Sequence, residues 1–315
     1  MPSPICTIGD THGHLQLALC MAACWQRERN ITFDAVFLCG DVGTFTSDEQ
    51  LDDATRRLGE PNPCELEFLY QWLAVPFPNW LQMIFAPTEH GGMGLTCPVV
   101  MVHGNHEGFS HLQTLVSAVS TDKIVEITHL PTVDRGGFIR YLPNGCRCRT
   151  QSDIVVGGIG GIDIRQRVGL YPDMAYFDDA VISQFRKVPP VDLLITHQGP
   201  SEFQGDGGSA FLQELLKTGR MRCWCHSHSV QRPGIATAGP SGRIRVVPLK
   251  DATFMKSSSD PGRDCFAAIH FDSSKEPPQA EMIYPKNWGN YHQRNWFQLD
   301  GNRLVCPDLA QFVES

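Results

Sequence analysis

The sequence has little charge and no excess of basic residues. Charged residues make up 19% of the 315 positions and aromatic residues 9%, and 26 Lys and Arg stand against 34 Asp and Glu, for a net charge of −8. A protein that wraps a long nucleic acid normally carries the opposite sign, so this balance disfavours binding to an extended duplex. Hydrophobic residues make up 42% of the chain, which excludes intrinsic disorder and suffices for a large core.

A disulfide framework and a signal peptide are also missing. The twelve cysteines include Cys6 and Cys39, which fall in apolar runs where a small buried thiol is expected. The sequence opens as MPSPICTIGD, with no basic stretch followed by a long apolar one. We therefore expect no cleaved leader and a reducing cytoplasmic location.

The stretch from Phe68 to Thr88 contains no charged side chain but several aromatic ones, such as Trp72 and Phe85. Pro76, Pro78 and several amide side chains interrupt it, which argues against a transmembrane helix. The segment is predicted to be a packed helical hairpin or a lid. The alternative is that residues 68–88 contact a partner or a membrane.

Apolar runs rich in Val and Ile alternate with helical patterns, which predicts βαβ units around buried sheets. The expected strands are Ile5–Ile8, Ala35–Cys39, Val99–Val102, Ile154–Gly158, Asp192–Thr196 and Met221–Cys225. The expected helices are His14–Arg29, Ser110–Val119, Asp178–Lys187 and Ala210–Thr218. Beyond residue 230 the pattern favours antiparallel strands at Arg243–Pro248, Cys265–Phe271 and Glu281–Tyr284, and a hairpin turn at Asp300–Gly301.

Five short polar clusters follow predicted strands. They are Gly9-Asp10-Thr11-His12-Gly13, Gly40-Asp41, Gly104-Asn105-His106-Glu107, Thr196-His197 and Cys225-His226-Ser227-His228. Ligands of α/β sheets bind beyond the carboxyl ends of strands, so we expect the clusters to converge. Each alone is typical of a turn or a surface histidine, but together they indicate a site. Oxygen and imidazole donors suit Mn²⁺, Fe²⁺ or Zn²⁺ better than Ca²⁺.

The order of these clusters resembles the calcineurin-like metallophosphoesterase superfamily, over residues 5–228. The resemblance implies a four-layer α/β/β/α sandwich and two divalent metal ions (Mn²⁺, Fe²⁺ or Zn²⁺). One ion would lie on Asp10, His12 and His228 and the other on Asn105, His197 and His226, with Asp41 bridging them. It also implies a hydrolase in which a metal-bound hydroxide attacks phosphorus, with His106 a catalytic residue rather than a ligand.

Two details bear on the substrate. The arginine that follows the second motif in protein Ser/Thr phosphatases is absent, because the chain reads Gly40-Asp41-Val42-Gly43. The continuation Gly108-Phe109-Ser110 after the third motif is similar to RNA lariat-debranching enzymes, although Asp10 stands where those enzymes commonly have cysteine. The expected activity is therefore a phosphodiesterase acting on a nucleotide or RNA as its phosphoester substrate.

Other candidates surround these motifs. Arg149, Arg165 and Arg167 flank a glycine-rich turn and are candidates for binding substrate phosphate. Cys225 replaces the glycine usual in the last motif, and is expected to be either a core residue or a soft metal ligand. We expect a catalytic domain over residues 1–250, with an insertion at 44–97 as a possible lid, and a β-rich extension over 251–315 packed on the same domain.

Two other functions stay open at this point. One is a phosphomonoesterase that uses the same metals on a small metabolite or a phosphoprotein. The other is a non-catalytic metal-binding module that docks a partner.

Overall fold

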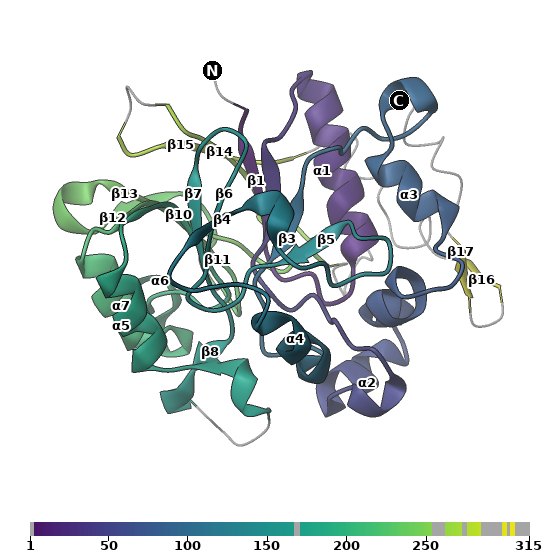
Figure 1. The fold of residues 1–315 in the computed structure, drawn as a ribbon, viewed down its shortest axis with the longest axis horizontal. Helices are drawn as coiled ribbons and strands as arrows, with labels where there is room; N and C mark the ends of the chain where they lie inside the picture. Colours follow the sequence, from purple (N-terminus) through teal and green to yellow (C-terminus); the bar gives the residue numbers. More distant parts are fainter. Residues whose placement is uncertain are drawn as a thin grey trace.

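The computed structural model describes residues 3–166, 171–253, 262–272 and 276–284, together with the backbone of 298–300 and 303–305. Two large mixed sheets form the middle of the molecule, and helices cover the outer face of each (Figure 1). The expected four-layer α/β/β/α sandwich is confirmed.

The first sheet has six strands, of which β1, β2, β3 and β5 run parallel. Its order is β15 (Gln279–Met282), β14 (Phe266–His270), β1 (Ile5–Ile8), β2 (Ala35–Leu38), β3 (Val99–Met101) and β5 (Ile139–Tyr141). β14 pairs antiparallel with β1 and with β15, so residues beyond 250 complete this sheet.

The second sheet has seven strands, of which β7, β10, β11 and β13 run parallel. Its order is β12 (Ala236–Ala238), β13 (Ile244–Pro248), β11 (Met221–His226), β10 (Val191–Thr196), β7 (Val155–Ile159), β6 (Arg147–Arg149) and β4 (Ile124–Glu126). Two smaller pairs join β8 (Ile162–Asp163) to β9 (Tyr176–Phe177) and β16 (Gln298–Asp300) to β17 (Arg303–Val305).

An apolar core fills the space between the two sheets. Phe37 and Val102 from the first sheet pack there with Leu193 and Val247 from the second. Several thiols share this core, and every cysteine in the described ranges except Cys97 is buried. Cys225 is one of the core residues, as the simpler of its two interpretations predicted.

The helix layers follow from the patterning of their residues. α1 (Leu15–Arg29) is buried on all sides from Leu15 to Gln26, because it lies between the first sheet and the insertion. It ends at Asn30, whose left-handed backbone caps the helix. α5 (Asp179–Lys187) and α7 (Ala210–Lys217) each bury one apolar face on the second sheet.

The insertion at 44–97 is mostly helical and packs on α1. It contains α2 (Asp53–Gly59), a π-helix at Phe68–Trp72 and α3 (Asn79–Phe85). The charge-free stretch is thus largely packed: Trp72 is fully buried, and the rings of Phe85 and Phe138 stack 4.1 Å apart. None of the described helices is long and apolar enough to cross a membrane.

The remaining helical elements are short. They are α4 (Phe109–Val116), α6 (Ser201–Gln204) and 3₁₀ turns at Asp48–Gln50, Pro63–Leu66, Thr88–His90, Ile127–His129, Ile164–Gln166, Asp173–Ala175, Gly205–Gly207 and Pro240–Gly242.

One expectation about the strands was wrong in part. The strand expected at Arg243–Pro248 is β13, which pairs antiparallel only with β12 and runs parallel to its other neighbour, β11. The loop from 227 to 243 allows this, because it is long enough to return the chain across the sheet and to form β12 on the way. Antiparallel pairing of β16 with β17 agrees with a hairpin at 300–301, although Gly301 lies outside the described residues.

Candidate metal centre

The polar clusters meet at one edge shared by both sheets. Asp10 and His12 follow β1, Asp41 follows β2, and Asn105 follows β3, all in the first sheet. From the second sheet, His197 follows β10 and His226 is the last residue of β11. Parallel strands end on the same side, so residues more than 200 positions apart become neighbours: the His228 amide donates to Asp10 Oδ2 at 3.0 Å.

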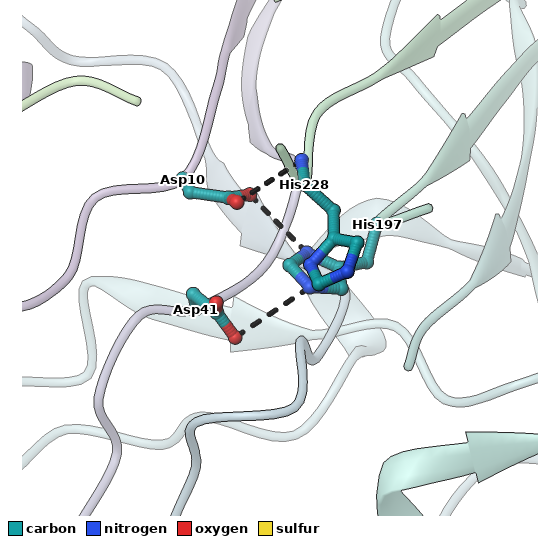
Figure 2. A group of neighbouring side chains, drawn as sticks. All are labelled: Asp10, Asp41, His197 and His228. Carbon is teal, nitrogen blue, oxygen red and sulfur yellow. Dashed lines mark hydrogen bonds and ion pairs between the residues drawn. The ribbon is translucent and has the colours of Figure 1, made fainter. Parts of the chain in front are cut away.

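Four of the predicted ligands form one compact group. Asp10, Asp41, His197 and His228 each offer a ligand atom, and these atoms lie within 4.8 Å of one another. Figure 2 shows Asp10 and Asp41 directed at the His197 ring, and Asp10 also joined to the backbone amide of His228. His197 is central, because its Nδ1 lies 3.2 Å from Asp10 Oδ1 and its Nε2 lies 3.6 Å from Asp41 Oδ1.

Asp10 also belongs to a second group, with His12 and Asp251. The Asp41 carboxylate lies between the two groups, because its Oδ2 is 3.7 Å from His12 Nε2 while its Oδ1 faces His197. Asp251 was not among the predicted ligands. It follows β13, which lies beyond the last of the five polar clusters, so only the position of β13 in the second sheet places Asp251 near Asp10 and His12.

The two remaining predicted ligands lie at the edge of this arrangement. Asn105 Oδ1 accepts a hydrogen bond from His197 Nε2 at 2.9 Å, which places the amide oxygen beside the first group. His226 is fully buried, and its Nε2 has no hydrogen-bond partner among the described residues. His226 is in neither of the two groups.

Three of the predicted ligands have a backbone conformation that is rare for residues other than glycine. His12, Asp41 and His228 all adopt positive φ angles of 42°, 47° and 59°, a conformation that costs non-glycine residues energy and is concentrated at functional sites. The neighbouring glycines permit close approach. A Cβ on Gly104 would lie 1.9 Å from Asp41 Oδ1, and one on Gly40 would lie 2.5 Å from the His197 ring.

The charges of the group are complementary. Burial alone would raise the pKa of Asp41, but the nearby His197, His106 and His12 lower it well below its usual range. Burial would lower the pKa of His197, yet Asp10 and Asp41 outweigh it and raise that pKa to about 10. Burial lowers the pKa values of His226 and His228 to about 4, so both imidazoles are neutral, the form that binds metals.

The donor set fits divalent cations. Asp10 Oδ1 and His226 Nε2 are buried, and neither has a directed hydrogen bond among the described residues. Buried polar atoms are normally satisfied, so an unsatisfied oxygen in the compact group and an unsatisfied nitrogen at its edge indicate groups arranged for another partner. Mixed carboxylate, amide and imidazole donors are typical of Mn²⁺, Fe²⁺ and Zn²⁺ sites.

His106 has its own set of contacts. Its Nδ1 is bonded to Asp52 Oδ2 at 2.9 Å, and its Nε2 lies 3.3 Å from the Tyr171 hydroxyl. Asp52 also caps α2, with Oδ1 accepting from the Thr55 amide at 2.8 Å. Burial would lower the pKa of His106, but Asp41 and Asp52 together raise it to about 9. Asp52 was not among the predicted site residues, because it lies in the insertion and only its helix-capping pattern marks it.

Glu107 holds the loops in place. Its carboxylate accepts hydrogen bonds from the amides of Val42 and Thr44, both at 2.9 Å, and from the Thr44 hydroxyl at 2.7 Å. The loop after β3 is thereby fixed to the loop after β2, which carries Asp41. Glu107 is the last residue of the third polar cluster, but the spacing of that cluster alone does not distinguish a carboxylate that holds loops from one that binds a metal.

Two of the three candidate arginines lie in the described part of the chain, and each is paired with a carboxylate of its own neighbourhood. Arg149 pairs with Asp153 and lies beside the start of β7, at the end of the sheet opposite the metal ligands. The guanidinium of Arg165 is bound to Asp163 and lies 3.5 Å from the centre of the Phe211 ring. Arg167 lies outside the described residues.

A two-sheet α/β sandwich with carboxylates and imidazoles converging at its strand ends defines a metal-binding class of protein. The sequence model of the family described as Calcineurin-like phosphoesterase matches residues 3–232. The chain therefore belongs to the calcineurin-like phosphoesterase family, and it is a metal-dependent phosphoesterase.

Other comparisons are more distant. No curated protein matches the chain. A solved structure, described as the crystal structure of TT1561 of Thermus thermophilus, is 12% identical, with 90% of this chain and 100% of that chain covered and a TM-score of 0.47. The likeness to lariat-debranching enzymes stays a prediction.

Proposed function

We propose that this phosphoesterase hydrolyses phosphodiesters of nucleotides or nucleic acid. In this proposal two divalent cations are held by the predicted ligands, which are Asp10, His12, Asp41, Asn105, His197, His226 and His228. Bound cations would supply charge neutralisation at the phosphoryl oxygens and activation of the attacking water. Their identity is proposed to be Mn²⁺, Fe²⁺ or Zn²⁺.

The protein's own groups have distinct tasks in this reaction. Asp41 faces His12 with one oxygen and His197 with the other, which supports a bridging role. His106 Nδ1 is held by Asp52, so its Nε2 is the atom available to protonate the leaving oxygen. Burial lowers the pKa of His106, but Asp41 and Asp52 outweigh it, which favours the protonated imidazole that a general acid requires.

The preference for a diester is supported by the kinds of charge around the site. The largest electrostatic interactions of His12, Asp41 and His197 within the described chain all involve Asp, Glu or His and no Lys or Arg. A phosphomonoester carries nearly two negative charges at pH 7, and sites that bind such groups commonly use Arg to clamp them. A diester carries one charge, which the cations alone can offset.

The experiment compares bis(4-nitrophenyl) phosphate with 4-nitrophenyl phosphate, for protein loaded with Mn²⁺, Fe²⁺ or Zn²⁺. We expect a higher kcat/KM for the diester with at least one metal, and no turnover of either after chelation. A preference for the monoester with every metal would replace the proposal by a phosphomonoesterase. Binding of metal without turnover of either compound would favour the non-catalytic module.

A second comparison addresses the nucleic-acid substrate. Matched oligonucleotides with one 2′,5′ or one 3′,5′ linkage present the same charge and the same bases. Cleavage confined to the 2′,5′ linkage would support a debranching activity, and equal cleavage would support a general phosphodiesterase.

A further inference from the structure

A cleft of about 200 Å³ is lined by Asn105 and Glu107, the two chain neighbours of His106. Its walls come from three separate parts of the chain: the insertion, the turn that leads from β3 into α4, and the segment between β8 and β9. Asp52 and Tyr171, which both contact the His106 ring, line it. A group that occupies the cleft would therefore be attached to the oxygen that His106 protonates.

The cleft is mainly apolar and aromatic. Its lining includes Phe45 and Phe109, which are only 2% and 8% exposed, and Tyr171, which is half-buried. The Tyr171 ring lies edge-on to His106, with the ring centres 5.2 Å apart. Aromatic walls of this kind favour flat aromatic groups, because nucleobases and other rings stack on them.

The charge of the lining excludes an anionic occupant. Asp52 and Glu107 are among the lining residues, and no Lys or Arg is. A leaving group with a further phosphate would place its charge beside these carboxylates, and no Lys or Arg of the lining would offset it. An uncharged group meets no such penalty.

The size limits the occupant further. Clefts that hold a whole drug-sized ligand measure roughly 300–1,000 Å³. This cleft is smaller, so it suits a single ring system rather than an entire nucleotide. Polar side chains at its rim, Gln50 and Ser110, are exposed and could bond to the edge of such a ring.

We infer that this cleft is a leaving-group subsite that receives a planar, uncharged aromatic group, such as the base of a nucleoside. The inference rests on the proposed phosphodiesterase function and narrows its substrate to esters whose leaving alcohol carries such a ring.

The first test removes only the ring from the substrate. The methyl phosphodiester of adenosine is compared with the same diester of 1-deoxyribose, because the two leaving oxygens are chemically alike. We expect release of adenosine and methyl phosphate, with kcat/KM at least about tenfold higher for the compound with a base, mainly through KM. Equal values would overturn the inference.

Two further substrates define the ring. A methyl diester of 2-phenylethanol tests whether any aromatic group suffices: if it matches adenosine, the subsite takes aryl groups in general, and if it matches 1-deoxyribose, the subsite takes nucleosides. Both outcomes agree with a planar occupant. If the methyl diester of 2-cyclohexylethanol is hydrolysed with the same preference as the diester of the aromatic compound, a planar occupant is excluded. Adenosine with an added phosphate on its free ribose oxygens should lose the preference.

The second test changes the protein. Tyr171→Leu removes the wall and should bring the ratio of kcat/KM for adenosine over 1-deoxyribose down towards one, while Tyr171→Phe keeps the ring and the ratio. Any effect through His106 acts on both substrates and cancels in this ratio. Ser110→Leu should narrow the cleft and lower the same ratio, whereas Ser117→Leu, at an exposed serine just past the end of α4, should not. An unchanged ratio in both Tyr171→Leu and Ser110→Leu would refute the subsite.

Failure of the function and failure of the subsite give different results. If no diester is hydrolysed but 4-nitrophenyl phosphate is, the diester proposal fails. The subsite is then tested with adenosine monophosphate against 1-deoxyribose phosphate. If small diesters are hydrolysed without preference for a ring, only the subsite fails.

Discussion

The two sheets bring different chemistry to the same site. The first supplies both carboxylates of the compact group, Asp10 and Asp41, whereas the second supplies its imidazoles, His197 and His228. Neither set alone would balance charge, because the buried carboxylates need cations and the buried imidazoles need acceptors. The difference shows that the site is a property of the interface between sheets rather than of either sheet.

A single hydroxyl illustrates how closely the two layers are joined. Ser227, from the second sheet, accepts a hydrogen bond from the Asp10 amide at 3.0 Å and donates to the Leu249 carbonyl at 2.9 Å. The turn after β1 is thereby held against the turn after β11. Substitutions on each side can therefore show which contributions the site needs.

Asp41→Asn should have the largest effect, because it removes the carboxylate that faces histidines from both sheets. We expect metal content to fall and kcat/KM to drop by at least about 10³-fold, since bound cations supply several kcal/mol of transition-state stabilisation. Elemental analysis and a bis(4-nitrophenyl) phosphate assay on the same preparation check this. Full metal content in the variant would contradict a bridging role.

His106→Ala should lower turnover while leaving the metals in place. Loss of a side-chain acid typically costs about 10²–10⁴-fold. The measurement pairs kcat with metal content, and Asp41→Asn is the contrasting variant that should lose both. Parallel loss of metal and activity in His106→Ala would make His106 a ligand or a structural residue.

Asp52→Asn should have a smaller effect, on the order of tenfold in kcat, because it acts only by positioning His106. Asparagine is as good a helix cap as aspartate, so α2 should be retained. The decisive measurement is the double variant with His106→Ala, which should be no slower than His106→Ala alone. Additive losses would show that Asp52 acts independently of His106.

Asp251→Asn should weaken metal binding without changing kcat at saturating metal. Residues that support metal ligands typically change affinity by about 10–100-fold, and a shift of this size should appear in a titration with Mn²⁺. Asp206→Asn, at an exposed aspartate in the turn at Gly205–Gly207, is the matched control. Equal metal affinity in the two variants would remove Asp251 from the site.

Glu67→Gln should affect stability alone, on the helix-covered face of the first sheet. Burial raises the pKa of Glu67 to about 8, despite hydrogen bonds from the Trp72 indole and the Gln16 amide. The folded chain therefore holds a proton that the unfolded chain releases above about pH 4.5, so the free energy of unfolding falls as pH rises from about 4.5 to 8, by on the order of a few kcal/mol.

The measurement is urea unfolding of metal-free protein at pH 5.5 and pH 8.5. Glu67→Gln should lose less stability between the two values than the unchanged chain. An identical pH dependence would mean that Glu67 is ionised in the folded protein.

The positions of helices and strands could be predicted from the sequence where a hydrophobic pattern matches a buried element. The strand at Ile5–Ile8 and the helix that ends at Arg29 lie where expected, because continuous apolar runs and periodicity determine them. The convergence of Asp10 and His228 was also predictable, since both follow strands that lie inside their sheets. The direction of β13 was not, because the antiparallel expectation came from strands without intervening helices, and that pattern does not identify the strand with which each one pairs.

The residues around His106 could not be predicted in the same way. Asp52 and Tyr171 come from an insertion and an irregular segment, where the fold rather than a motif decides which side chains meet. The position of Arg149 depends on the fold for a related reason. Sequence proximity to the glycine-rich turn says nothing about strand direction, and β6 runs away from the site, so it carries Arg149 to the far end of the sheet.

The thiols packed between the sheets can report how often the two sheets separate. Burial raises the pKa values of Cys39 and Cys148. In the folded protein these thiols are therefore shielded from solvent and protonated, and a buried thiol reacts slowly with alkylating reagents. Modification would require the two layers to separate, which would also disperse the carboxylates and imidazoles. The rate of thiol labelling would therefore measure how often the metal centre comes apart, without any need for a substrate.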